Sequence, residues 1–107
     1  MSVMSPIQRC AIKFGALILS GPMEEGHAGV IRQINSGEPW WREEWERARK
    51  DGAVFQGFLQ ENGRFVDRPA ARIIAIAAGQ VAEADLPDPH IIFSEDFIMA
   101  KKEEPSK

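Results

Sequence analysis

The sequence predicts a small α+β protein in which a small antiparallel sheet packs against two to three helices. The chain has 107 residues, about one average domain, with 44% hydrophobic and 27% charged residues, as is usual for globular proteins. Two segments rich in β-branched and aromatic residues, 11–19 and 53–59, are separated by segments whose apolar residues recur at helical spacing. The dipeptide Asn62-Gly63, which favours tight hairpin turns, follows the second of them.

The first elements are expected on either side of a glycine. Gly15 lies near the middle of residues 11–19, which predicts two short strands or one bent strand. Residues 20–22 (Ser-Gly-Pro) then break the chain. Residues 24–34 have helical apolar spacing and begin with two glutamates, which suit the positive end of a helix, and Gly37 can end this helix.

A second helix is predicted over residues 40–50, after Glu-Pro at 38–39 and before Asp-Gly at 51–52. Trp41 and Trp45 are four residues apart and share one face of it. Tryptophans at this spacing usually pack into a core or a subunit interface, and more rarely stack on a nucleotide base. We therefore expect Trp41 and Trp45 to pack into the core or into a subunit interface; if exposed, they would form a surface for assembly.

The hairpin leads directly into a third helix. Residues 53–59 and 64–66 are its two strands, and Asp67 is a good N-cap for a helix over residues 68–78. Gly79 can end that helix.

The ends of the chain carry weaker signals. We expect a flexible N-terminus at residues 1–9, a single ligand-binding domain at 10–98 and a disordered charged tail at 99–107. Residues 86–89 are a rigid loop rich in proline, and 90–93 could form a last strand at a sheet edge.

Composition excludes several kinds of protein. The net charge of −3 leaves no basic stripe for duplex nucleic acid, although a small anion needs only a local pair of arginines. The one cysteine, Cys10, forms neither an internal disulfide nor a zinc framework, so we expect no metal and no cofactor. No apolar run approaches the roughly 20 residues of a membrane span, so we expect a soluble, cytoplasmic protein without membrane contact.

The sequence also lacks the usual signs of catalysis, so we expect that the protein is not an enzyme. Its two histidines, His27 and His90, stand in no serine-nucleophile, phosphate-loop or zinc-protease motif. Neighbouring carboxylates such as those at 24–25 and 43–44 are more simply solvated helix faces. Cys10 has the features of a buried, inert thiol.

Arg64 and Arg68 are the strongest candidates for binding residues. Both are expected near the N-terminus of the third helix, whose free N–H groups attract anions, and guanidinium groups bind phosphate oxygens with two parallel hydrogen bonds. The alternative is that they only pair with nearby carboxylates such as Asp67 or Glu61, which contributes little.

Three further side chains could shape a ligand pocket. His27 begins a helix, where it could contact a base or a phosphate, or act only as a surface or capping residue. Phe58 and Phe65 flank the turn and could line the pocket or fill the core; we assign Phe65 to the core and keep Phe58 as a ligand-binding candidate.

The hairpin and third helix resemble a known family of short phage proteins, the anti-Thoeris proteins of the first described type. The resemblance lies in Gln56-Gly57-Phe58-Leu59, in Gly63-Arg64-Phe65-Val66-Asp67-Arg68, in Ala71 and Ile74, and in Ala77-Ala78-Gly79-Gln80-Val81. The N-terminal strands and the Gly26-His27 step are also similar, so most of residues 10–81 is covered. Residues 40–50 look like added or divergent material, and 86–97 lie outside the resemblance.

This resemblance implies a function and a set of site residues. Such proteins are not enzymes; they sequester the cyclic ADP-ribose isomers made by bacterial TIR-domain sensors, and some take up cyclic oligonucleotides at a separate site. They act as homo-oligomers, either dimers or hexamers. The resemblance implies that Arg64 and Arg68 bind the ligand, with His27 as a further contact. We therefore expect an obligate oligomer that works as a cyclic nucleotide sponge in the cytoplasm of an infected bacterium.

Two other functions stay open. The helix over residues 40–50 carries an acidic, tryptophan-bearing face, which suits a protein-binding inhibitor of a host defence enzyme. A nucleotide-cleaving enzyme would use similar binding groups but would consume its ligand, whereas a sponge releases the ligand unchanged on heating.

Overall fold

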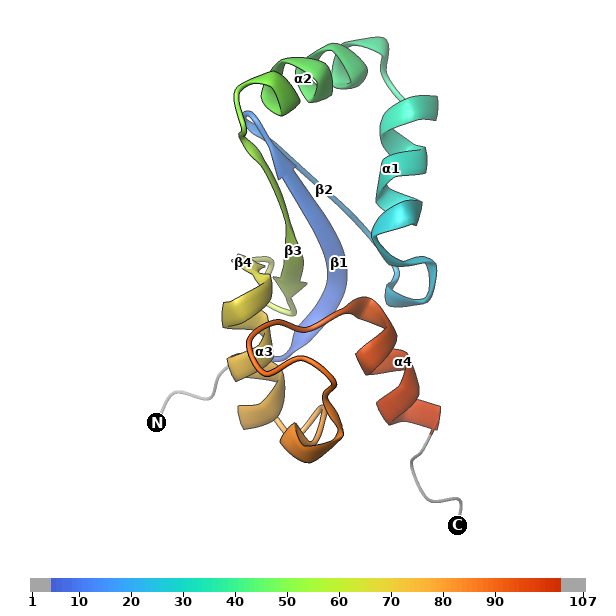
Figure 1. The fold of residues 1–107 in the computed structure, drawn as a ribbon. Helices are drawn as coiled ribbons and strands as arrows, with labels where there is room; N and C mark the ends of the chain where they lie inside the picture. The colour runs from blue at the N-terminus through green and yellow to red at the C-terminus, as the bar shows by residue number, and fades with distance from the viewer. Residues whose placement is uncertain (1–4, 103–107) are drawn as a thin grey trace.

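The structure is a computed structural model and describes residues 5–102 of the chain. It confirms the predicted α+β class, with one antiparallel sheet and four α-helices in the described part (Figure 1). The strands are β1 (Ile7–Phe14), β2 (Leu17–Gly21), β3 (Val54–Gln60) and β4 (Phe65–Asp67). The helices are α1 (Gly26–Ser36), α2 (Pro39–Lys50), α3 (Arg68–Ala77) and α4 (Ser94–Lys102), with short 3-10 turns at Met23–Glu25 and Glu83–Asp85.

The sheet has the strand order β2-β1-β3-β4, and every neighbouring pair is antiparallel. Two glycines make its tight turns. Gly15, at φ 60°, separates β1 from β2, so the first segment forms two strands. Gly63, at φ 87°, lies in the predicted turn between β3 and β4. Both conformations are strained for residues that carry a Cβ.

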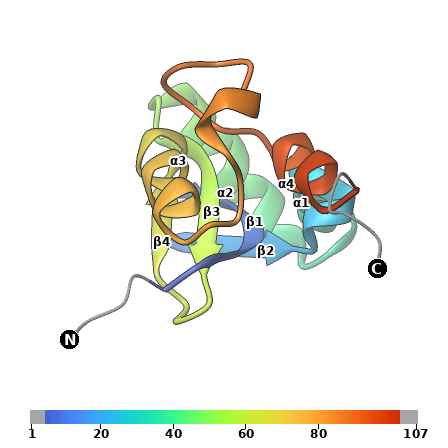
Figure 2. The ribbon, with the colours of Figure 1, turned by 90° about the horizontal axis from the view of Figure 1, so that it is seen from below.

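The helices gather on one side of the sheet (Figure 2). On that side Ile12 and Phe14 of β1 and Phe58 of β3 are fully buried. The other side carries Lys13 and the half-exposed Phe55, which face each other across β1 and β3. This gives a two-layer protein with its core between the sheet and the helices.

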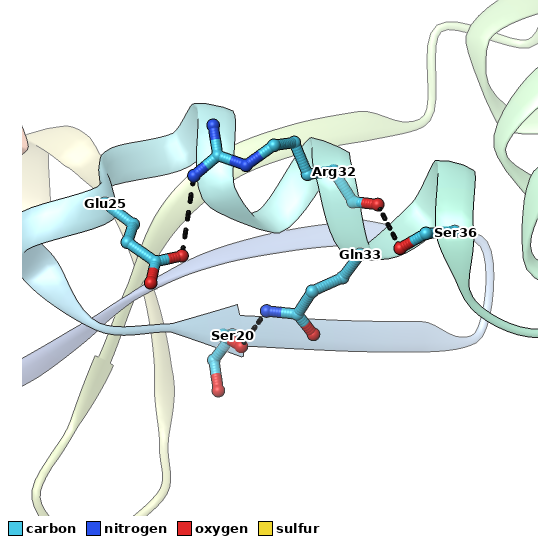
Figure 3. A network of polar contacts seen from close by, with 5 residues as sticks. All are labelled: Ser20, Glu25, Arg32, Gln33 and Ser36. Atoms are coloured by element: carbon cyan, nitrogen blue, oxygen red, sulfur yellow. Dashed lines mark hydrogen bonds and ion pairs between the residues drawn. The ribbon is translucent and has the colours of Figure 1, made fainter.

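Polar contacts fix α1 along the sheet (Figure 3). Gln33 Nε2 donates to the Ser20 carbonyl oxygen of β2 at 2.8 Å. In the last turn of α1, Ser36 Oγ donates a hydrogen bond to the Arg32 carbonyl oxygen. The Arg32 side chain forms a surface ion pair with Glu25 at 3.5 Å. The exposed ion pair contributes little, so the contact of Gln33 with β2 is the stronger of these two constraints on α1.

Two of the three tryptophans of helix α2 pack against the core. Trp45 packs its ring edge-on against Phe14, with centroids 5.7 Å apart, and Trp41 is half-buried against the same core. Trp40 is the tryptophan left 53% exposed. Of the alternatives for Trp41 and Trp45, packing against the core is the one that the structure shows, and the two rings do not form an exposed surface.

Helix α3 begins as its sequence predicts. Asp67 Oδ1 accepts a hydrogen bond from the Ala70 N–H at 3.0 Å, which is the N-cap contact. Ala71, Ile74 and Ala75 of this helix are buried in the core.

The C-terminal segment differs from the prediction. Residues 90–93 do not form a strand, because Asp88 Oδ1 accepts from the N–H groups of both His90 and Ile91 and turns the chain there. Helix α4 follows, and Asp96 Oδ2 accepts from the Phe93 N–H at its start. This helix extends past residue 98, where the domain was predicted to end, and it is a fourth helix where two or three were predicted.

The domain also starts earlier than residue 10. Gln80 binds both backbone groups of Ile7, accepting from its N–H at 2.8 Å and donating to its carbonyl at 2.7 Å. These contacts fix the start of β1 against the end of α3, so residues 7–9 are strand. Ser5 and Pro6 also bond to the hairpin, since their carbonyl oxygens accept from Gln60 Nε2 and from the Glu61 N–H. Residues 1–4 and 103–107 of the predicted flexible ends lie outside the described residues.

Candidate functional site

Three helices begin around one pocket of about 500 Å³. Its walls include Gly26 and His27 of α1, Arg68 of α3 and Ser94 of α4. A Cβ on Gly26 would lie 3.1 Å from Ser94 Oγ, so the starts of α1 and α4 approach closely. Helix N-termini carry free N–H groups and the positive end of the helix dipole. Three of them beside an arginine suit the anionic part of a ligand, while three glutamates that also line the pocket make its rim acidic.

Arg68 is the one cation lining this pocket. Its Nη2 donates to Gln56 Oε1 at 2.8 Å, and its guanidinium carbon lies 4.9 Å from the centroid of the Phe93 ring. Its Nε is buried without a hydrogen-bond partner. No carboxylate lies within ion-pair distance of Arg68 among the described residues, so it does not form the simple surface pair considered above.

His27 is buried beside Arg68 in its neutral form. Its Nε2 lies 2.8 Å from the carbonyl oxygen of Gly57, which can only accept, so Nε2 carries the proton. Its Nδ1 then faces Arg68 Nη2 at 3.4 Å as an acceptor. Burial, with the nearby Arg68 charge, lowers the pKa of His27 below its usual 6.5. The imidazole therefore adds no charge to the pocket at neutral pH.

Phe58 packs against His27, one of the residues that line the pocket. The side chain is fully buried, and its ring centroid lies 5.2 Å from that of His27 and 5.5 Å from that of Phe97. A residue without exposed surface holds its neighbours in place and has no face for a ligand.

Arg64 lies away from the other candidates within one chain. It is exposed at the hairpin, where its N–H donates to Asn62 Oδ1. The whole of β4 separates it from Arg68, about 13 Å along an extended strand. Arg72, one helical turn after Arg68, bonds the Asp88 carbonyl oxygen through its Nε and so takes no part in the pocket. The structure thus brings together His27, Arg68 and Phe58, but not Arg64.

Gln56, Phe93 and the acidic rim of the pocket were not among the predicted site residues. The rim consists of Glu24, Glu25 and Glu95, which can accept hydrogen bonds from hydroxyl or amino groups. The run Ser94-Glu95-Asp96 before apolar residues is a helix-start signal that could have located α4. Nothing in the sequence marks the contact between Gln56 and Arg68.

Other features of the described chain offer less chemistry. A larger groove of about 610 Å³ also borders α4, but it has no arginine or histidine. Cys10 is buried with its Sγ 3.5 Å from Met23 Sδ, and burial raises the pKa of its thiol to about 11. Residues 5–100 contain no cluster of three side chains suited to a metal ion. Of the described helices, none is long and apolar enough to cross a bilayer.

Fold and pocket together define a small two-layer α+β protein in which three helices begin around a pocket that holds an arginine. The chain belongs to the phage T4 y16D protein family, whose model matches residues 11–97. No curated protein matches the chain. No solved structure matches it either.

Proposed function

We propose that this phage protein is a non-enzymatic sponge that binds and holds a small phosphorylated immune signal, a cyclic ADP-ribose isomer or a cyclic oligonucleotide. In this role it counteracts anti-phage defence in the bacterial cytoplasm. The observation that carries the proposal is the pocket where α1, α3 and α4 begin around Arg68, a cation without an acidic partner. Two further observations support the proposal. Residues 63–68 resemble sponge proteins, and the chain belongs to a phage family.

Each part of the pocket suits one part of such a ligand. Arg68 binds a phosphate oxygen through its guanidinium, and the N–H groups at the helix starts add weaker contacts. The Phe93 ring gives an apolar wall for a base, and Glu95 accepts from ribose hydroxyl groups. His27 Nε2 donates its proton to the Gly57 carbonyl oxygen, so this proton is engaged within the protein and not offered to a ligand.

One chain alone does not supply a sponge's affinity. Nanomolar binding corresponds to about 12 kcal/mol, whereas a charge-assisted hydrogen bond contributes roughly 1.5–3 kcal/mol. We infer that the protein is a homo-oligomer, a dimer or hexamer, in which the exposed Arg64 of one copy reaches the Arg68 pocket of another. A symmetric pair would complete two such sites at once.

The alternative is a protein-binding inhibitor that acts through α2. The half-exposed Trp40 favours it, since exposed tryptophans are common at the centres of interfaces. Against it, two of the glutamates of α2 pair within the helix, Glu44 with Arg47 and Glu46 with Arg49, which reduces its acidic character. We therefore rank it second.

Ligand retention tests the proposal. The protein is mixed with a cyclic ADP-ribose isomer, separated from free ligand by gel filtration, and then heated, and the released material is identified by chromatography and mass spectrometry. We expect the ligand to co-elute with the protein and to be released chemically unchanged, because the site holds its ligand without reacting.

Two results would argue against the proposal. Release of a cleaved product would identify a nucleotide-cleaving enzyme. Failure to retain either this ligand or a cyclic oligonucleotide would leave the inhibitor hypothesis, which a gel-filtration shift with a candidate partner enzyme then tests.

A further inference from the structure

Gln56 lies beside Arg68 because of the register of the sheet. Gly57 pairs with Asp67 across β3 and β4, so the preceding residue of β3 lies next to the first residue of α3. The Gln56 Oε1 accepts from Arg68 Nη2 at 2.8 Å. This contact joins residues twelve positions apart in the sequence.

We propose that Gln56 is the positioning residue of the pocket, which orients the Arg68 guanidinium while leaving its positive charge free for an anionic ligand. The inference rests on the proposed function and concerns how the same pocket presents its one arginine to an anionic group.

The guanidinium is held in two directions. Gln56 fixes it within its own plane through Nη2, and the ring of Phe93 lies against its face. These contacts leave Nε buried and unpaired. A long side chain constrained in this way loses little further freedom when a ligand binds, which favours affinity.

The amide at position 56 also decides the charge of the pocket. A glutamate there would have the same length and would accept the same hydrogen bond, but it would add a full negative charge within ion-pair distance of Arg68. Arg68 has no carboxylate at that distance among the described residues. A neutral acceptor therefore orients the guanidinium without competing with the ligand, whereas an acidic one would act as a built-in anion.

Isothermal titrations of Gln56→Glu and Gln56→Leu with a cyclic ADP-ribose isomer, at several salt concentrations, test this. Gln8→Glu adds the same charge on an exposed strand residue outside the pocket and serves as the control. We expect Gln56→Glu to lose at least about tenfold in affinity, with a flatter salt dependence and an unchanged or raised Tm. Gln56→Leu should lose less affinity and keep the salt dependence of the wild type, because Arg68 stays charged. Gln8→Glu should bind like the wild type.

The outcomes separate the two claims. If the wild type binds and Gln56→Glu binds equally well with the same salt dependence, the positioning role is wrong and the sponge stands. If Gln56→Leu loses as much as Gln56→Glu, the loss of a neutral acceptor accounts for the whole effect and the charge argument is wrong. A wild type that binds neither this ligand nor a cyclic oligonucleotide overturns both claims.

Discussion

Arg68→Ala should lose at least about 100-fold in affinity for a cyclic ADP-ribose isomer and should keep its fold. The substitution removes the one cation that lines the pocket. Two charge-assisted hydrogen bonds contribute about 3–6 kcal/mol together, and each 1.4 kcal/mol corresponds to tenfold in affinity. The cost in stability should be small, because Arg68 forms no ion pair in the described chain and removing it eliminates a buried, unpaired Nε.

Titration calorimetry and thermal unfolding of matched variants measure both effects. Arg42→Ala removes an equal charge from the exposed face of α2 and should bind like the wild type. Arg68→Lys keeps the charge but not the planar fork and should be intermediate. If Arg68→Ala binds as tightly as Arg42→Ala, the ligand lies elsewhere on the protein.

Phe58→Ala should lower the free energy of unfolding by about 3–5 kcal/mol, the usual cost of removing a buried phenylalanine side chain. The ring is fully buried between His27 and Phe97, so its loss leaves a cavity beneath the pocket. A loss of this size is a large fraction of the stability of a small domain. Urea denaturation measures it, with Phe58→Leu as the variant that keeps most of the volume and costs less than about 1.5 kcal/mol.

The ligand affinity of Phe58→Leu then separates two roles for the residue. We expect it to stay within a few-fold of the wild type, since the ring supports His27 and has no exposed face. A Phe58→Ala variant that keeps its stability and loses only ligand binding would show that Phe58 contacts the ligand and that our placement of it is wrong.

The elements predicted correctly are those set by local chemistry. Asn62-Gly63 fixes the hairpin turn, Asp67 caps α3 through the Ala70 N–H, and Gly15 divides the first two strands. Each of these signals acts over a few residues. They were therefore visible without knowledge of the fold.

The pocket depends on contacts between segments that are distant in sequence. His27 reaches Gly57 across thirty residues, and the contact of Gln56 with Arg68 follows from strand register. The spacing of Arg64 and Arg68 suggested two neighbouring side chains, but a strand lies between them and carries them apart.

Helix α4 was missed for a different reason. Its first residues give a start signal, but its apolar residues are few and none of them is fully buried. Its place is set by Asp96 at its N-terminus and by Phe97 packing on Phe58. Because α4 supplies one wall of the pocket, the site itself could not be predicted without it.

Backbone amide shift mapping by NMR during titration with a cyclic ADP-ribose isomer tests the central claim most directly. A ligand that binds where the three helices begin should shift the amides of Gly26, His27, Arg68 and Ser94 most strongly, and should leave the Trp40 indole unchanged. Shifts confined to α2 and Trp40, or no shifts at all, would contradict the assignment of this pocket as the ligand site.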